Sequence, residues 1–289
     1  MIPAAFDYHA PGSLAEAIEL LGKYGDAKVL SGGQSLLPLL KLRLGSAAHL
    51  IDINRVPGLE YIKEEGGFLK IGGRTREAAL EESDLIRKKY PILSDTARVI
   101  ADPIVRNLAT IGGNLAHGDP ANDHPATMLA LGAVVVATGK KGERTIPIDA
   151  FFTGLFETAL AQDEILTEIR IPMPTGRSGG AYAKLERKVG DFATAGAAAQ
   201  LALGAGGEVT KAGIGLTNAG LVPVKAAEAE KALQGKKPDG AAIAEAAKLA
   251  ANATDPQPDR RGDVDYKKEM ARVLTARALQ KAVERAKGA

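Results

Sequence analysis

The chain contains no cysteine among its 289 residues. Without cysteine it can form no disulfide, supply no thiolate to a metal ion or an iron–sulfur cluster, and use no cysteine nucleophile. Those four classes of site are therefore excluded from this chain. The absence of cysteine does not by itself assign the chain to a cellular compartment.

The chain also lacks long apolar runs and a strong charge of one sign. No run approaches the length of a membrane-spanning helix, and the first eleven residues, with Pro3, Asp7 and His9, do not resemble a secretory signal. Lysine and arginine number 37 against 35 acidic residues, and no basic cluster alternates with aromatic residues. Nucleic-acid binding is therefore disfavoured. We expect a cytoplasmic protein, or one held at a membrane through a partner.

The length and the periodic segments predict two domains. Pro172–Gly180 contains two prolines and three glycines and predicts the boundary between them. Before it, helical spacing and a capping box predict a helix over 13–24. The remaining periodic segments predict strands at 27–30, 49–53, 68–71, 134–137 and 166–171, and helices at 36–44, 77–89 and 125–131. Beyond the boundary, strands at 182–185, 194–203 and 212–217, a helix capped by Asp239 and a helix over 265–287 predict an antiparallel sheet with helices on it.

Two glycine-rich segments, Leu30–Pro38 and Ala109–Asp123, stand out from the rest of the chain. Glycine loosens helices and strands, and proline cannot complete the hydrogen bonding of either, so both segments are predicted as loops with exposed N–H groups. In each, a Gly-Gly pair is followed by an amide, Gln34 or Asn114, and is flanked by hydroxyl side chains. Neutral donors of this kind suit a diphosphate. The two loops therefore predict one ligand clamped between them.

The glycine segments by themselves leave alternatives open. The chain has 33 glycines and the Gly-Gly pair occurs six times, so the glycines could simply form turns. Neither segment matches the G-x-G-x-x-G fingerprint or the phosphate loop of NTPases, which disfavours a standard Rossmann site and a P-loop enzyme.

The residues in and around these segments resemble a known family. Ser31–Arg43 and Arg106–Asn114 are similar to the two FAD-binding signatures of the molybdenum hydroxylases. The resemblance is closest to the separate medium, or flavoprotein, subunit of carbon monoxide dehydrogenase-type enzymes, and the FAD domain of xanthine dehydrogenase is more distant. Other segments are also similar and occur in the order of the family. Phe6–Tyr8 precedes the two signatures, and the segments after them are Lys184–Lys188, Asp191–Ala193, Arg261–Asp263, Tyr266 and Ala271–Leu274.

The resemblance implies an α+β fold. A FAD-binding domain of the vanillyl-alcohol-oxidase, or PCMH, type would span residues 1–175, with two α/β subdomains of about 1–57 and 58–175. A smaller α+β domain, an antiparallel sheet with helices, would span 176–289 and close over the isoalloxazine ring.

The resemblance also implies which residues contact FAD. The two glycine segments would hold the pyrophosphate and adenosine parts, Asp123 would contact the ribityl region, and two further segments would approach the ring. One departure is Ser31, where alanine is commoner in the family. The implied cofactor-binding residues are Leu30, Ser31, Gly32, Gly33, Gln34, Ser35, Leu36, Leu37, Ala109, Thr110, Ile111, Gly112, Gly113, Asn114, Asp123, Ile165, Leu166, Tyr182 and Lys184.

The family distributes its other cofactors over partner subunits, in agreement with the absence of cysteine. A small subunit carries [2Fe–2S] clusters and a large subunit carries molybdopterin, and we expect a dimer of heterotrimers. FAD here would receive electrons from a [2Fe–2S] cluster and pass them to an external acceptor. The protein would position and tune the flavin, so no catalytic side chain is nominated. A stand-alone FAD-dependent oxidoreductase of the same fold and a flavin-free assembly subunit remain as alternatives.

Other patterns favour structural interpretations. The spacing of the metal-binding types His117, Asp119, Asp123 and His124 matches no zinc signature, so no metal site is predicted and a metal-dependent hydrolase is the least favoured function. The charged run 77–89 predicts a solvated helix face. The apolar stripe of the last helix predicts core packing rather than a docking surface.

Overall fold

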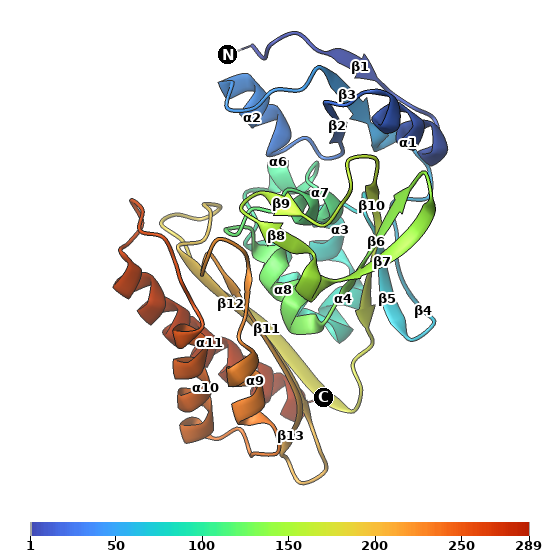
Figure 1. The fold of residues 1–289 in the computed structure, drawn as a ribbon. Coiled ribbons are helices and arrows are strands. Elements are labelled where there is room, and N and C mark those ends of the chain that lie inside the picture. Colours follow the sequence, from blue (N-terminus) through green and yellow to red (C-terminus); the bar gives the residue numbers. More distant parts are fainter. Residues whose placement is uncertain (1, 289) are drawn as a thin grey trace.

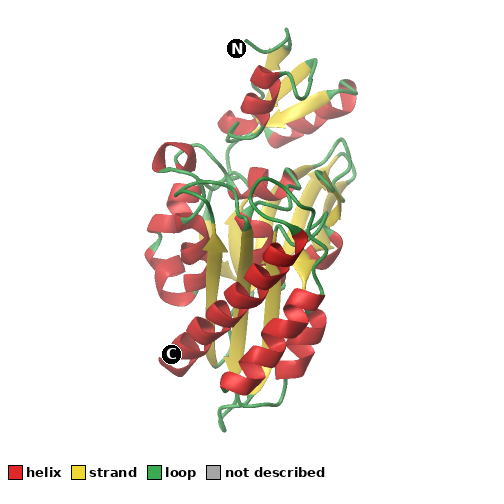
Figure 2. Cartoon of the chain, turned by 90° about the vertical axis from the view of Figure 1, so that its left-hand side faces the viewer, coloured by secondary structure: helices red, strands yellow, loops and turns green. Residues whose placement is uncertain are grey.

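The computed structural model describes residues 2–288, which form three main sheets in succession along the chain (Figure 1). The first is a three-stranded parallel sheet of order β1-β3-β2. In Figure 2 this N-terminal unit lies at the top, above the other two sheets. Its elements are β1 (Asp7–His9), α1 (Leu14–Lys23), β2 (Ala27–Leu30), α2 (Leu36–Leu42), β3 (His49–Asp52) and the 3-10 turn η1 (Ile53–Arg55).

The first helix shows how local sequence sets the N-terminal unit. Ser13 is the N-cap of α1, and its side chain accepts a hydrogen bond from the N–H of Glu16 at 3.2 Å. Ala17, Ile18 and Leu21 form the buried face of the helix. They pack with residues of the sheet and with Ile165 from a later strand. The predicted helix over 13–24 is confirmed, and its apolar stripe fixes it against the parallel sheet.

The second sheet is antiparallel and five-stranded, of order β4-β5-β10-β6-β7. Helices α3 to α8 are inserted between its second and third strands in the sequence. The elements are β4 (Ile62–Glu65), β5 (Phe68–Gly72), α3 (Glu77–Glu82), α4 (Asp84–Lys89), α5 (Pro91–Arg98), α6 (Pro103–Arg106), α7 (Ile111–Ala116), α8 (Asp123–Leu131), β6 (Val134–Gly139), β7 (Gly142–Pro147), η2 (Ile148–Ala150), β8 (Phe152–Gly154), β9 (Glu157–Thr158) and β10 (Ile165–Pro172).

The third sheet is antiparallel and four-stranded, of order β11-β12-β13-β14. Helix α11 packs along β11 and β12, and α8 packs against β12 and β13 (Figure 1). Every residue of α8 is buried, because it lies between this sheet and the second one. The elements are β11 (Arg177–Leu185), β12 (Ala195–Leu203), β13 (Val209–Thr217), β14 (Val224–Lys225), α9 (Ala227–Leu233), α10 (Gly240–Asn252) and α11 (Val264–Gly288).

Two of the predicted segments differ in detail from the sequence-based expectations. The predicted helix over 77–89 is divided at Ser83, which ends α3 and caps α4 by accepting a hydrogen bond from Ile86. Its face is not simply solvated, because Glu77, Leu80 and Ile86 are fully buried. The proline- and glycine-rich stretch 172–180 is also mostly strand, since β10 ends at Pro172 and β11 begins at Arg177. Within residues 2–288, no helix combines the length and the apolarity of a membrane span.

A partly buried ion pair between Arg285 and Asp95 connects helix α11 to the second unit. Arg285 donates to both oxygens of Asp95 on α5, at 2.6 and 3.0 Å, and to the carbonyl of Gly180 at 2.6 Å. We expect Arg285→Ala to lower the free energy of unfolding by about 1–2 kcal/mol, because the pair is two-pronged but partly exposed. Chemical denaturation measures the loss. Arg272→Ala on the exposed side of the same helix is the matched control and should change little; equal losses would contradict the role of Arg285.

Candidate functional site

The first glycine segment connects β2 to α2 and has the free backbone donors that its sequence predicts. Gly33 has a φ of +62°, a left-handed conformation that residues with a Cβ rarely adopt. The N–H groups of residues 32–36 donate no hydrogen bond to any residue within 2–288. Ser35 precedes α2 without a side-chain capping bond. The loop therefore presents consecutive unpaired N–H groups, with the hydroxyl of Ser35 beside them.

The second glycine segment is not the open loop that its sequence predicts. Residues 111–116 form helix α7, whose N-cap Thr110 accepts a hydrogen bond from Gly113 at 3.2 Å. The N–H groups of Ile111 and Gly112 donate to the carbonyls of Thr75 and Gly73 at 3.1 and 3.0 Å. The prediction of exposed N–H groups here is therefore wrong at these positions. The segment is helical despite its glycines because residues 73–75 satisfy the first donors of the helix.

The two glycine segments meet in the structure. The hydroxyls of Ser31 and Thr110, 79 positions apart in the sequence, are 2.9 Å from each other. A Cβ atom on Gly32 would lie 2.7 Å from the Cα of Ala109 and would clash with the carbonyl oxygen of Leu108. Only glycine at position 32 permits this approach of two backbones. A single ligand can therefore contact both segments, as the sequence predicts.

The groups at this junction fit a cofactor that contains a diphosphate. The first segment supplies unpaired N–H donors, which suit the oxygens of an anion. The side-chain oxygen of Asn114 on α7 is buried and has no hydrogen-bond partner among residues 2–288. A buried polar atom of this kind costs stability unless a ligand or water satisfies it. Both features are those of a site that a polar cofactor completes.

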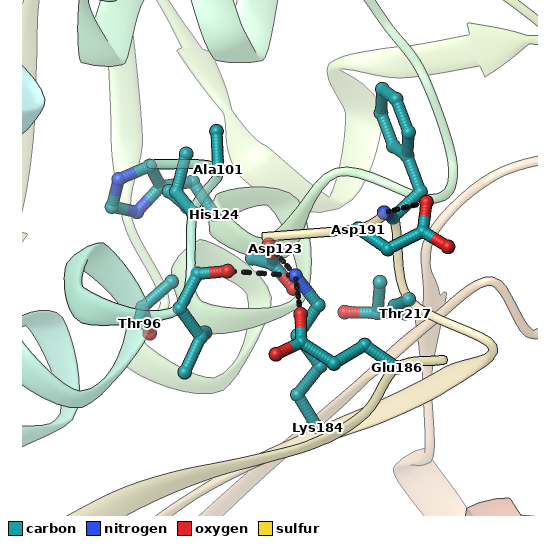
Figure 3. A network of polar contacts seen from close by, with 12 residues as sticks. Thr96, Ala101, Asp123, His124, Lys184, Glu186, Asp191 and Thr217 are labelled. Carbon is teal, nitrogen blue, oxygen red and sulfur yellow. Dashed lines mark hydrogen bonds and ion pairs between the residues drawn. The ribbon is translucent and has the colours of Figure 1, made fainter. Parts of the chain in front are cut away.

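Asp123, Tyr182 and Lys184 form a second cluster, at the contact between α8 and β11. The two carboxylate oxygens of Asp123 accept hydrogen bonds from the Tyr182 hydroxyl at 2.6 Å and from the Lys184 ammonium at 2.9 Å. Figure 3 shows that Lys184 also points toward Glu186 and a backbone carbonyl, which is that of Val99 at 2.8 Å. This cluster joins the second unit to the third.

Burial dominates the electrostatics of this cluster. Burial raises the pKa of the Asp123 carboxyl, and the adjacent charge of Lys184 opposes the shift. Burial and the neighbouring Asp123 carboxylate raise the pKa of the Tyr182 hydroxyl well above its ordinary value. Tyr182 is therefore a neutral donor, and the charge of Lys184 favours the ionised form of Asp123 against the effect of burial. Asp123 is fixed in one orientation by both partners.

Ile165 and Leu166 lie at the start of β10, a strand that packs against α7 of the second glycine segment. The two residues are only 3% and 6% exposed. Ile165 packs into the core of the N-terminal unit and Leu166 into that of the second unit. A contact of these residues with a cofactor would therefore have to come from the backbone.

The residues of metal-binding type have other partners. The Nε2 atom of His124 and the Oε2 atom of Glu77 are 2.6 Å apart, and both side chains are fully buried. Asp119 accepts a hydrogen bond from the N–H of Ala121, and burial lowers the pKa of His117. Among residues 2–288, no group of three or more histidines, aspartates and glutamates has the arrangement of a metal site. The Glu77–His124 pair is 47 positions apart, and no sequence signal predicts it.

Comparisons with known proteins agree with this architecture. A family model described as "FAD binding domain in molybdopterin dehydrogenase" matches residues 4–174, and one described as "CO dehydrogenase flavoprotein C-terminal domain" matches residues 180–282. The carbon monoxide dehydrogenase medium chain of Hydrogenophaga pseudoflava is 46% identical over 283 residues, 98% of each chain.

Solved structures show the same likeness. A carbon monoxide dehydrogenase structure from Hydrogenophaga pseudoflava has a TM-score of 0.96 and 48% identity, with 99% of each chain covered. Quinoline 2-oxidoreductase from Pseudomonas putida 86 has a TM-score of 0.92 and 34% identity, also with 99% of each chain covered.

The fold is thus a mixed α/β FAD-binding domain followed by a C-terminal flavoprotein domain, as the resemblance implies. The chain belongs to the FAD-binding subunits of molybdenum-containing oxidoreductases, of the carbon monoxide dehydrogenase medium-chain type. FAD is accordingly its cofactor. The family prediction made from the two glycine signatures is confirmed.

Proposed function

We propose that this subunit accepts electrons from the [2Fe–2S] clusters of a small partner subunit and passes them through FAD to an external acceptor. The main support is the meeting of two glycine segments, one with unpaired N–H groups, in a chain without cysteine. Such a chain can hold a dinucleotide but cannot ligate an iron–sulfur cluster through thiolates. Bound FAD supplies a redox centre that exchanges electrons with both sides.

We propose the following roles for this chain's own residues. The N–H groups of residues 32–36 hold the diphosphate, and Thr110 and Asn114 complete the site from the other side. Asp123, oriented by Lys184 and Tyr182, accepts hydrogen bonds from hydroxyl groups of the ribityl chain. The backbone at Ile165–Leu166 and the segment Tyr182–Lys184 approach the ring.

The same family membership supports a proposal about the assembly. We propose a large molybdopterin-binding partner and a small iron–sulfur partner, assembled as a dimer of heterotrimers in the cytoplasm or at a membrane through the complex. A carbon monoxide dehydrogenase and a quinoline 2-oxidoreductase both resemble this chain over nearly its whole length. This similarity supports selection of the organic substrate by the molybdenum subunit rather than by this one.

We also propose the domain limits 1–175 and 176–289, with subdomains of about 1–57 and 58–175. Two observations support them. The family models meet between residues 174 and 180. The first and second sheets are joined by the segment between η1, which ends at Arg55, and β4, which begins at Ile62.

The test uses the purified full-length chain and the complex from its native cells. Denaturation of the chain should release FAD, and FAD within the complex should lose its visible absorbance when the molybdenum subunit is given its reducing substrate. The isolated, FAD-loaded chain should not be reduced by that substrate. Reduction of the isolated chain would instead indicate a stand-alone oxidoreductase. A flavin-free chain that binds both partners would indicate an assembly subunit.

A further inference from the structure

Arg76 is a basic residue that contacts the second glycine segment directly and is linked to the first through Asn54, although it belongs to neither segment. It precedes α3, and its backbone pairs with Thr110 in an isolated antiparallel bridge. Its guanidinium donates to the carbonyl of Leu108, directly before the second segment, and to the side-chain oxygen of Asn54 at 2.6 Å. Arg76 is therefore fixed to the second segment by both its backbone and its side chain.

Asn54 extends this connection to the first segment. Its amide nitrogen donates to the carbonyl of Ser31 at 2.7 Å and to Asp52 at 2.6 Å. Asn54 lies in the turn after β3, and β2, which leads into the first segment, pairs with β3. Leu108, Arg76, Asn54 and Ser31 thus form one continuous chain of hydrogen bonds. This chain spans the junction beside the direct contact between the Ser31 and Thr110 hydroxyls.

The hydrogen-bond partners of Arg76 carry no charge, and the Glu60 and Asp52 carboxylates attract its guanidinium without a direct bond to it. Both partners are neutral: a backbone carbonyl and a side-chain amide. Arg74, two residues earlier, is different, because it pairs with the Glu60 carboxylate at 2.9 Å. A guanidinium carries five N–H donors and stays charged in proteins, so Arg76 has donors left over. A partly buried charge of this kind beside unpaired N–H groups favours an anion.

We propose that Arg76 and Asn54 form a strut that sets the spacing of the two glycine segments, and that the charge of Arg76 attracts the diphosphate of FAD. This inference rests on the diphosphate site of the proposed function. Asn54 is a positioning residue, because it acts through Arg76 and Ser31. Arg76 both sets the spacing of the segments and attracts the diphosphate. Substitutions that keep or remove its charge can separate these two effects.

The test is FAD binding to the full-length chain, followed by flavin fluorescence at low and at high salt. Arg76→Gln removes the charge, and we expect the dissociation constant at low salt to rise about tenfold or more, with a weaker dependence on salt. Arg76→Lys keeps the charge but cannot make both hydrogen bonds, to Leu108 and to Asn54. It should therefore weaken FAD binding and retain the salt dependence. Asn54→Ala should likewise weaken FAD binding and retain the salt dependence, because the charge of Arg76 is still present. Arg74→Gln, the matched control, should bind within about twofold of the wild type.

The outcomes separate this inference from the proposed function. A wild-type chain that binds no FAD would overturn both. Wild-type binding together with an unchanged dissociation constant and salt dependence in Arg76→Gln would overturn the strut alone. Thermal unfolding of each variant monitors the fold. If Arg76→Gln does not fold, the FAD affinities of Arg76→Lys and Asn54→Ala become the test. Wild-type affinity in both variants would reject the inference.

Discussion

Gly32→Ala is expected to abolish tight FAD binding, with a rise in the dissociation constant of about 100-fold or more, equivalent to ~2.7 kcal/mol. The new Cβ would clash with the Leu108 carbonyl oxygen and lie 2.7 Å from the Cα of Ala109. Both obstacles are backbone atoms, which cannot rotate away. The two segments must therefore separate, and the 2.9 Å contact between Ser31 and Thr110 is lost. Titration with FAD, followed by flavin fluorescence, measures the effect.

Gly45→Ala is the matched control for this substitution. Gly45 belongs to the same N-terminal unit, and no atom lies within 4 Å of the position that its Cβ would take. The Gly45→Ala variant should bind FAD with the affinity of the wild type. A Gly32→Ala variant with the affinity of Gly45→Ala would mean that the junction of the two segments does not hold the cofactor.

The sequence predicted the helices and strands that are set by local signals. Ser13 and Asp239 cap α1 and α10 as expected, because capping needs only residues within one turn. The edge strands β4 and β7 were not predicted. Their sequences, Ile-Lys-Glu-Glu and Gly-Glu-Arg-Thr-Ile-Pro, are largely polar, and they pair only because β5 and β6 offer free edges.

The candidate site was predictable in part. The two glycine segments were predicted to hold one ligand, and the structure brings them together. Their individual geometry was not predictable, because α7 depends on acceptors from residues 73–75. The sequence also could not show which glycines tolerate a side chain and which do not. An added Cβ at Gly113 would meet only the Thr110 hydroxyl, whereas one at Gly32 would meet backbone.

The residues that connect the site were beyond sequence patterns. Arg76 and Asn54 are 22 positions apart, one before α3 and the other in the turn after β3, so only the tertiary fold joins them. Asp123, Tyr182 and Lys184 were named from the family resemblance. Their mutual contacts, across 59 and 61 positions, come from the packing of α8 on the third sheet. Polar contacts over such separations leave no periodic signal.

Lys184→Met is expected to lower the free energy of unfolding by about 3–5 kcal/mol, because it leaves the Asp123 carboxylate buried without its cation. The side chains of Lys184 and Asp123 are only 3% and 6% exposed, so water cannot replace the lost charge. Denaturant unfolding measures the loss. Lys188→Met, at an exposed position shortly after β11, is the control and should leave the stability near that of the wild type.

The loss in Lys184→Met should also depend on pH. Burial already raises the pKa of Asp123, and removal of Lys184 raises it further. A carboxyl whose pKa is higher in the folded state than in the unfolded chain stabilises the fold at low pH, and this stability is lost as the pH rises toward the folded pKa. The deficit should therefore be smaller at about pH 5 than at about pH 8. Adding Asp123→Asn should remove most of the pH dependence and recover part of the stability. An equal deficit at both pH values would mean that Lys184 acts through its packing and its bond to Val99 rather than through the charge of Asp123.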